Sequence, residues 1–254
     1  MTQVTISIVS HGHGALMDLL LTDIERLQPQ SVAQIVVTLN VAEPWKPPPR
    51  IGDIDITVIR NQVPAGFGAN HNRAFLQCKT PIFAVLNPDL RLPQDPFPGL
   101  LVRLAKQRCG MAVPWQVDAQ GMVEDFRRKL PTPLSLTRRS LRALRAVDKE
   151  LTCTEELDWV AGSFMAMHSD VFAAIGGFDE GYRLYCEDVD ICLRLQLAGW
   201  RIAVAAQPAV VHDARRDSGS GGRHLRWHLQ SFCRLWASRT YWRYLGWRTR
   251  RPAT

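Results

Sequence analysis

The sequence predicts an α/β protein whose mostly parallel sheet is flanked by helices. Short β-branched and apolar runs alternate with segments of helical periodicity over the first half of the chain. Polar residues follow several of these runs directly, where the strands of a parallel sheet end. The chain has 254 residues, 46% of them hydrophobic, so it can bury a substantial core. Together these observations favour alternating strands and helices around one sheet.

Five strands and three helices are expected in the first half of the chain. The strands are expected at 4–10, 35–40, 56–61, 82–90 and 110–117. The helices are expected at about 16–27, from the glycine-containing turn near 68 to about 77, and at about 97–107. This alternation is the pattern of parallel strands joined by crossover helices.

The second half of the chain is less regular. Residues 121–155 are basic and interrupted by prolines, and two interpretations stay open: a mobile loop and helix over a site, or a solvated insertion. A core strand entering a short helix is expected at 159–172, and a longer helix at 187–198. Residues 201–213 are expected to form a last strand pair broken by Pro208.

The positive charge is concentrated at the C-terminus. The net charge is +7, and from Arg215 onward the chain has ten Arg and one acid, Asp217. That segment contributes +9, so residues 1–214 sum to −2. The run SGSGG at 218–222 is typical of a flexible linker. We therefore expect one domain at 1–214 and a basic helical tail at 215–254.

Compartment and membrane topology are also indicated by composition. No apolar run approaches the roughly 20 residues that span a bilayer, and the N-terminus does not have the pattern of a signal peptide. The six cysteines are scattered without a CxxC pair, which argues against disulfides and a zinc site. A cytoplasmic location is therefore expected.

Polar residues at the strand ends are the first candidates for a site. They are Ser10, His11, Asn40, Asn87, Asp89, His212 and Asp213. A carboxylate fixed after a buried strand can bind Mg²⁺ or Mn²⁺, and His212 can supply a nitrogen ligand from another strand end. Asp89 after a proline is equally compatible with a plain turn, and His212 with a structural hydrogen bond.

The turn at 63–72 is a second candidate. Gly66 and Gly68 allow the backbone to approach a ligand closely, and the following helix begins with N–H groups that favour anions. No GK[ST] follows, so this is not a phosphate-binding loop of that kind.

Acidic residues before a helix are the third candidate. Glu187 and Asp188 stand where the helix begins, after an aromatic run. Acids in a first turn offset the helix dipole, which explains some of this pattern. An adjacent pair that is partly desolvated also suits a general base, because burial raises a carboxyl pKa. Both interpretations stay open from the residues alone.

Five motifs in order resemble one family. They are GFGANHNRA, LNPDL, WVAGSFMAM, GGFDEGYRLYCEDVDICLRLQLAGWR and VVH. Over about residues 4–213 they resemble the family 2 inverting glycosyltransferases of GT-A fold, nearest to the rhamnosyltransferase-like branch of bacterial surface-polysaccharide synthesis. The resemblance implies a Rossmann-like GT-A sheet, with a donor-binding half at about 1–120 and an acceptor half at about 121–214.

The resemblance also implies roles for single residues. Asp89 matches the aspartate that holds Mg²⁺ or Mn²⁺ against the sugar-nucleotide diphosphate, and His212 matches a histidine that helps. Asp188 matches the general base that deprotonates the acceptor hydroxyl, with Glu187 orienting it or the acceptor. The donor is expected to contact Ser10, His11, Asn40, Gly66, Phe67, Gly68, Asn72, Asn87 and Asp89. The acceptor is expected to contact Trp159, Gly162, Tyr185 and Glu187.

Two departures concern the nucleoside pocket. Leu39 stands where the family usually has an aspartate that contacts the nucleoside, although Asn40 is retained. The first strand ends in SHGHG rather than in the usual asparagine-containing turn. dTDP-rhamnose is the first expectation for the donor, followed by UDP- and GDP-sugars, and a glycan or a polyprenyl-diphosphate sugar for the acceptor.

The tail combines tryptophan with arginine. Leu225, Leu229, Phe232 and Trp236 form a stripe at helical spacing, and the helix is expected to break near 237–240. Such a helix suits an anionic membrane surface, which would make the protein peripheral at the inner face of the cytoplasmic membrane. Packing on the domain or on a second subunit, as in a homodimer, is the alternative. Nucleic-acid binding is not expected, because no recognised module accompanies the tail.

Two other function classes compete with a transferase. A sugar nucleotidyltransferase needs a basic glycine-rich loop after the first strand, and SHGHGALMDLL has no Lys or Arg. A non-catalytic sugar-nucleotide or membrane-binding scaffold fits the departures at Leu39 and Asn87, but Asp188 is present.

Overall fold

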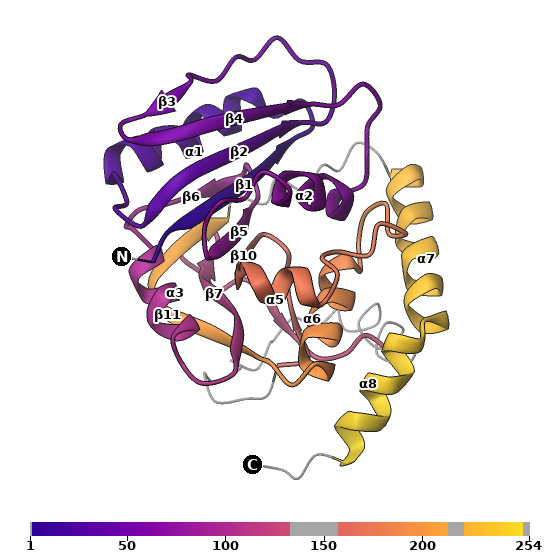
Figure 1. The fold of residues 1–254 in the computed structure, drawn as a ribbon. Coiled ribbons are helices and arrows are strands. Elements are labelled where there is room, and N and C mark those ends of the chain that lie inside the picture. The colour runs from indigo at the N-terminus through magenta and orange to yellow at the C-terminus, as the bar shows by residue number, and fades with distance from the viewer. Residues whose placement is uncertain (1, 133–156, 213–220, 251–254) are drawn as a thin grey trace.

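The computed structural model describes residues 2–132, 157–212 and 221–250 (Figure 1). Among them, nine strands form one sheet in the order β3-β4-β2-β1-β5-β10-β7-β11-β6, and β8 and β9 form a separate ribbon. The strands are β1 Val4–Ser10, β2 Val32–Leu39, β3 Arg50–Ile51, β4 Ile54–Arg60, β5 Ile82–Leu86, β6 Leu90–Arg91, β7 Cys109–Val117, β8 Arg127–Arg128, β9 Trp159–Val160, β10 Phe164–His168 and β11 Arg201–His212. The helices are α1 Gly14–Leu27, α2 Phe67–Phe75, α3 Phe97–Leu104, α5 Ser169–Ala174, α6 Glu187–Leu197, α7 Gly221–Ala237 and α8 Arg239–Arg250.

The long strands are parallel with one exception. Strands β4, β2, β1 and β5 pair in parallel, and so do β7 and β11. Strand β10 lies between β5 and β7 and is antiparallel to both. The start of β10 therefore lies at the same edge of the sheet as the ends of its parallel neighbours. The predicted α/β class is confirmed.

Two apolar clusters cover the two faces of the sheet. Helices α1 and α3 pack on one face, where Ile6, Ile8 and Ile24 are fully buried. Helices α2, α5 and α6 pack on the other face, around Phe83 and Phe172. Because side chains alternate along a strand, neighbouring residues of β1, β2 and β5 contribute to opposite faces, as expected of strands buried on both sides.

Two details of the expected elements are wrong. Residues 201–212 form one strand rather than a pair, because the pairing of β11 with β7 shifts register between Ala205 and Val210. Pro208 lies between these two paired stretches, where β11 does not pair with β7, so the proline needs no N–H there. Within the expected linker, Gly221 and Gly222 belong to α7. Most of the region 121–155 lies outside the described residues.

The two C-terminal helices pack on the domain. The helix breaks between Ala237 and Arg239, as predicted, and α7 and α8 run along the side of the molecule next to α6 (Figure 1). Leu235, Tyr241 and Tyr244 are buried in the same cluster as α6.

Half of the expected apolar stripe is packed on the domain and half is exposed to solvent. Phe232 and Trp236 pack on the domain, whereas Leu225 and Leu229 are each 59% exposed. No helix within the described residues combines the length and the apolar character needed to cross a bilayer.

Candidate active site

The predicted metal ligands lie close together where β11 pairs with β6, at the edge of the sheet where the parallel strands end. Strand β11 pairs with β6, which brings His212 opposite Leu90 and next to Asp89. His212 Nε2 lies 3.4 Å from Asp89 Oδ1, and His212 Nδ1 lies 2.6 Å from Glu124 Oε2. Burial disfavours the charged imidazole, but hydrogen bonding and attraction from Asp89 and Glu124 outweigh it and raise the pKa of His212 to about 9.

A buried polar link continues from this cluster along the edge. Gln116 near the end of β7 is fully buried, and Ser163 Oγ donates to its Oε1 at 2.7 Å. The carbonyl of Ser163 accepts the N–H of Asn87 at 2.8 Å. Gln116 Nε2 has no hydrogen-bond partner among the described residues, although a buried amide normally has one. The folded chain therefore leaves this buried NH₂ group without a partner among the described residues.

The predicted base lies at the other end of this link. Gly162, next to Ser163, donates its N–H to Asp188 Oδ2 at 3.2 Å, and Val189 N–H donates to Asp188 Oδ1 at 2.8 Å. Asp188 stands in the first turn of α6, whose dipole favours a negative charge. Burial nevertheless raises the pKa of Asp188, and Arg128 together with these N–H groups opposes the rise.

Glu187 has different surroundings from its neighbour. It is 5% exposed, and its Oε2 has no hydrogen-bond partner within the described residues. Burial and the nearby charge of Asp188 raise the pKa of Glu187 to about 8. The pair therefore holds one proton at neutral pH more readily than two negative charges.

The turn before α6, which positions Glu187 and Asp188, has an unusual backbone conformation. Tyr185 and Cys186 both have left-handed conformations, with φ of 73° and 65°. Two adjacent non-glycine residues in that region are strained, and such strain is found at functional sites. Here it precedes the two carboxylates directly.

Several residues predicted to contact the donor make hydrogen bonds or close contacts with other parts of the chain. Asn72 holds the turn before α6: its Nδ2 donates to the carbonyl of Phe178 at 2.9 Å, and its Oδ1 accepts the N–H of Phe178 at 2.8 Å. Gly66 lies so close to the carbonyl of Arg183 that a Cβ would come within 2.8 Å of it. A Cβ on Gly68 would come within 2.6 Å of Phe178. The side chain of Asn72 therefore holds the turn before α6, and the two glycines are explained by close packing of the chain on itself.

The ends of the first two strands also hold each other. Ser10 is fully buried, and its Oγ accepts the N–H of His13 at 3.0 Å, so its side chain stabilises a turn and does not face a donor. Asn40 Oδ1 accepts the N–H of Ala65 at 2.8 Å, and Asn40 Nδ2 lies 3.1 Å from Nδ1 of the exposed His11. Leu39 is buried in the core and offers nothing to a nucleoside.

Two predicted acceptor contacts have structural partners instead. Trp159 is 7% exposed, and its indole N–H donates to the carbonyl of Lys129 at 2.9 Å. Tyr185 Oη lies 2.6 Å from His224 Nδ1, and its ring stacks on His228 with centroids 3.4 Å apart. Trp159 thus belongs to the core, and Tyr185 contacts α7. Gly162 and Glu187 remain next to the base.

Comparison with known proteins agrees with this geometry. Residues 36–229 match the family model described as "Glycosyltransferase like family 2". The chain belongs to glycosyltransferase family 2. Rhamnosyltransferase WbbL of Escherichia coli K12 is 30% identical over 185 residues, which cover 68% of this chain and 70% of that protein.

Two further comparisons extend less far. A Mycobacterium tuberculosis N-acetylglucosaminyl-diphospho-decaprenol L-rhamnosyltransferase is 29% identical over 162 residues, 58% of this chain and 52% of that protein. A Pyrobaculum calidifontis mannosyltransferase, solved with GDP-Man and Mn²⁺, superposes with a TM-score of 0.66 at 14% identity. That superposition covers 94% of this chain and 65% of the mannosyltransferase, and it confirms the GT-A fold. This family 2 member thus spans about half of the mycobacterial relative and just under two thirds of the mannosyltransferase.

Sequence reasoning misses four residues of this family 2 site. They are Gln116, Glu124, Arg128 and Ser163. Glu124 and Arg128 lie in the irregular region after β7, where no periodicity places a side chain. Gln116, a polar residue in the apolar run GMAVPWQV, is the available signal, because a strand buried on both faces rarely contains an amide.

The residues at one end fit a divalent cation in part. No group of three or more His, Cys, Asp or Glu among the described residues is arranged to hold a metal. Asp89 Oδ1 and His212 Nε2 are nevertheless buried and face each other at 3.4 Å, so that each is the polar partner of the other. A carboxylate and an imidazole are ligands that Mn²⁺ accepts, and phosphate oxygens of a donor can supply others.

Proposed function

We propose that this family 2 glycosyltransferase moves a sugar, rhamnose first, from a nucleoside-diphosphate sugar to a hydroxyl of a glycan or lipid-linked acceptor, with inversion. The main support is the connected edge from Asp89 and His212, through Gln116 and Ser163, to Asp188. Glu187 Oε2 beside Asp188 and Gln116 Nε2 inside the edge are buried without a hydrogen-bond partner among the described residues, which is expected where ligands complete the hydrogen bonding. The rhamnosyltransferase names of the relatives support polysaccharide synthesis.

Inversion requires one base and no covalent intermediate. Asp188, oriented by the N–H groups of Gly162 and Val189, takes the proton from the acceptor hydroxyl as that oxygen attacks the anomeric carbon. Glu187 keeps its proton in this pair, so that the negative charge stays on Asp188. A neutral buried carboxyl can also donate a hydrogen bond to the acceptor.

Asp89 and His212 are the residues that would hold Mg²⁺ or Mn²⁺. The cation would stabilise the negative charge of the departing nucleoside diphosphate. The mannosyltransferase of the same fold contains Mn²⁺ with its GDP-sugar, which supports this assignment. In this proposal the side-chain amides of Asn87 and Gln116 donate hydrogen bonds to the sugar nucleotide, which is supported by the lack of a partner for Gln116 Nε2 among the described residues.

The proposed cellular context is the inner face of the cytoplasmic membrane. The mycobacterial relative is named for a diphospho-decaprenol sugar, which is a lipid-linked acceptor. Leu225, Leu229 and Trp242 are exposed on α7 and α8 among arginines, which suits peripheral contact with an anionic surface.

A thermal-shift screen tests the donor site. The protein is heated with dTDP, UDP, GDP or CMP, each with and without Mn²⁺. We expect a metal-dependent stabilisation by dTDP, which Asp89→Ala removes and which Asp53→Ala, at an exposed turn, retains. Equal stabilisation of both variants would remove Asp89 from the donor site.

One observation favours a second candidate function. Leu39 is buried where the family usually has a nucleoside-contacting aspartate. A non-catalytic membrane-binding scaffold is therefore the competing proposal. It predicts no stabilisation by any of the four nucleotides and no sugar transfer.

A further inference from the structure

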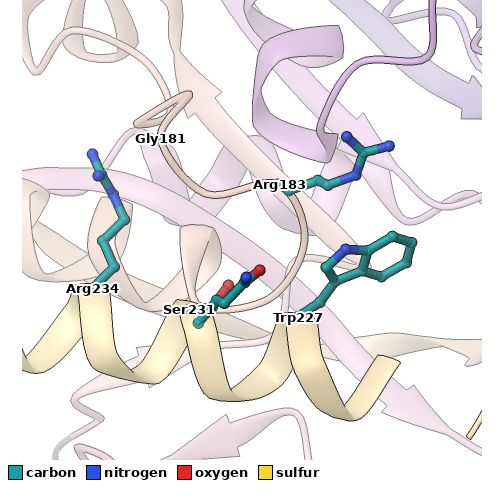
Figure 2. A pocket seen from close by; sticks show the side chains of 6 residues that line it. Gly181, Arg183, Trp227, Ser231 and Arg234 are labelled. Atoms are coloured by element: carbon teal, nitrogen blue, oxygen red, sulfur yellow. The ribbon is translucent and has the colours of Figure 1, made fainter. Parts of the chain in front are cut away.

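A second polar pocket lies between the turn before α6 and helix α7. Its volume is about 310 Å³. It is lined by Gly181, Arg183, Trp227, Gln230, Ser231 and Arg234. Figure 2 shows the two arginines at opposite ends of the pocket, with Ser231 between them. None of these residues belongs to the edge described above.

The two arginines are held differently. Arg234 forms hydrogen bonds of 3.0 and 2.9 Å to the two carboxylate oxygens of Asp179, and its guanidinium occupies the space where a Cβ on Gly181 would lie. Arg183 stands over the ring of Trp227 with its Cζ 5.4 Å from the centroid (Figure 2). Within the described residues its guanidinium makes no hydrogen bond or ion pair. The ring therefore orients a cation whose donors are available to an anion.

The pocket and the base lie on two sides of one short turn. The carbonyl of Arg183 accepts the N–H of Phe67 at 3.1 Å. The ring of Phe67 lies 3.6 Å from the Cβ position of Gly162, which donates to Asp188. The backbone of the Arg183 turn therefore packs against the ring that lies beside Gly162 and Asp188. In a lipid diphosphate that bears one sugar, a single sugar ring separates the accepting hydroxyl from the diphosphate.

We propose that this pocket binds the diphosphate of a lipid-linked acceptor, so that Arg183 holds the anion while the sugar reaches Asp188. This deepens the proposed function and rests on it, because it takes the acceptor to be a lipid diphosphate. Arg183 is the cation whose donors are available, and an arginine fork binds phosphate oxygens in pairs, whereas Arg234 is held by Asp179 at the other end of the pocket. The bordering helix α7 also exposes Leu225 and Leu229, an apolar surface of the kind that contacts a bilayer.

The test uses a soluble prenyl diphosphate as the probe. Farnesyl diphosphate binding is measured by calorimetry in EDTA, so that a metal-dependent donor site does not compete. Arg183→Gln should weaken binding about tenfold or more, since it removes a charge-assisted contact, and Arg183→Lys should restore part of it. Arg226→Gln is the matched control, because Arg226 is exposed on α7 and does not line the pocket.

Several results would overturn this assignment of the pocket. One is no binding of farnesyl diphosphate, and another is equal weakening of binding by Arg183→Gln and Arg226→Gln. If Arg183→Gln keeps its affinity for farnesyl diphosphate but no longer binds vesicles of equal parts phosphatidylcholine and phosphatidylglycerol, the anion is a membrane headgroup and not the acceptor.

The donor screen provides the independent readout. Stabilisation by dTDP and Mn²⁺ should be the same in Arg183→Gln and in the wild type. If dTDP with Mn²⁺ stabilises the protein but farnesyl diphosphate does not bind, the pocket proposal fails and the proposed function stands. If that stabilisation is absent from the wild type and Arg183 still governs farnesyl diphosphate binding, the proposed function fails and the lipid-diphosphate site stands.

Discussion

At the scale of single residues, Glu187 and Asp188 are adjacent yet differ in hydrogen bonding. Asp188 accepts two backbone N–H groups, whereas one oxygen of Glu187 accepts none within the described residues. Burial raises the pKa of both, and it does so to about 8 for Glu187. Hydrogen bonds to a carboxylate favour its charged form, so the negative charge belongs on Asp188.

Asp188→Asn should therefore abolish transfer. An amide retains the shape of the side chain but cannot accept the hydroxyl proton, and we expect a loss of about 10²–10⁴-fold in kcat. Stabilisation by dTDP and Mn²⁺ should be unchanged. Asp170→Asn is the control, because Asp170 accepts the N–H of Val171 at 2.7 Å in the same way, at the start of α5. Normal turnover by the Asp188 variant would refute the base assignment.

Glu187 also makes stability depend on pH. Its ordinary pKa of 4.5 rises to about 8 in the folded protein, so between these values the folded state binds more protons than the unfolded state. The free energy of unfolding therefore falls as pH rises through this window. Glu187→Gln cannot ionise, and its unfolding free energy should change less with pH.

Urea unfolding at about pH 5 and about pH 8 measures this difference. Glu25→Gln, on the exposed face of α1, removes one carboxylate without removing a buried one, and it should follow the wild type. A wild type and a Glu187→Gln variant with the same pH slope would show that Glu187 is ionised without cost in the folded protein.

At the scale of elements, the turn between α5 and α6 is built by contacts distant in sequence. Asn72 on α2 holds Phe178, 106 residues away, and also donates to Glu180 Oε1 at 3.0 Å. Gly177 has a φ of 63°, and a Cβ there would lie 2.5 Å from Asn72 Oδ1. The turn that precedes Asp188, the proposed base, is thus held against α2, whose N-cap is Gly66.

Asn72→Ala tests this reassignment from donor contact to clamp. Removing its two hydrogen bonds to Phe178 and the one to Glu180 should lower the unfolding free energy by about 1–3 kcal/mol. The affinity for dTDP with Mn²⁺, measured by calorimetry at a temperature where the variant is folded, should stay close to that of the wild type. A large loss of nucleotide affinity without loss of stability would return Asn72 to the donor site.

The same turn shows where sequence reasoning ends. Periodicity places the strands and helices because their apolar faces are local patterns, and a strand end before Asp89 or His212 is visible in the same way. Whether Asn72 faces a ligand or another loop depends on pairings between distant segments. The antiparallel insertion of β10 is equally invisible locally, yet it brings Gly162 and Ser163 to the edge.

At the scale of the whole molecule, the two C-terminal helices are part of the folded core. Asp158 is 4% exposed and joins α8 to the segment after β8. It accepts the hydroxyl of Tyr244 at 2.9 Å and the N–H of Leu130 at 2.6 Å, and it forms an ion pair with Arg248 at 2.9 Å. Composition indicates a separate basic tail, because arginine counts do not reveal that tyrosines on the same helices are buried. The exposed arginines and the buried tyrosines occupy different faces.

Removal of α7 and α8 should therefore destabilise the protein rather than merely detach a membrane contact. Truncation after residue 220 exposes apolar surface that Leu235, Tyr241 and Tyr244 cover, each worth roughly 1.5–3 kcal/mol when fully buried, and leaves Asp158 with one backbone donor. Tyr244→Phe removes only the hydroxyl and should cost about 1–3 kcal/mol. Arg243→Gln, exposed on the same helix, should cost almost nothing. Thermal unfolding of the three variants measures these differences in stability.

If the truncated chain unfolds at the temperature of the full chain and loses only vesicle binding, α7 and α8 serve membrane contact alone, and the buried tyrosines contribute nothing to the stability of the fold.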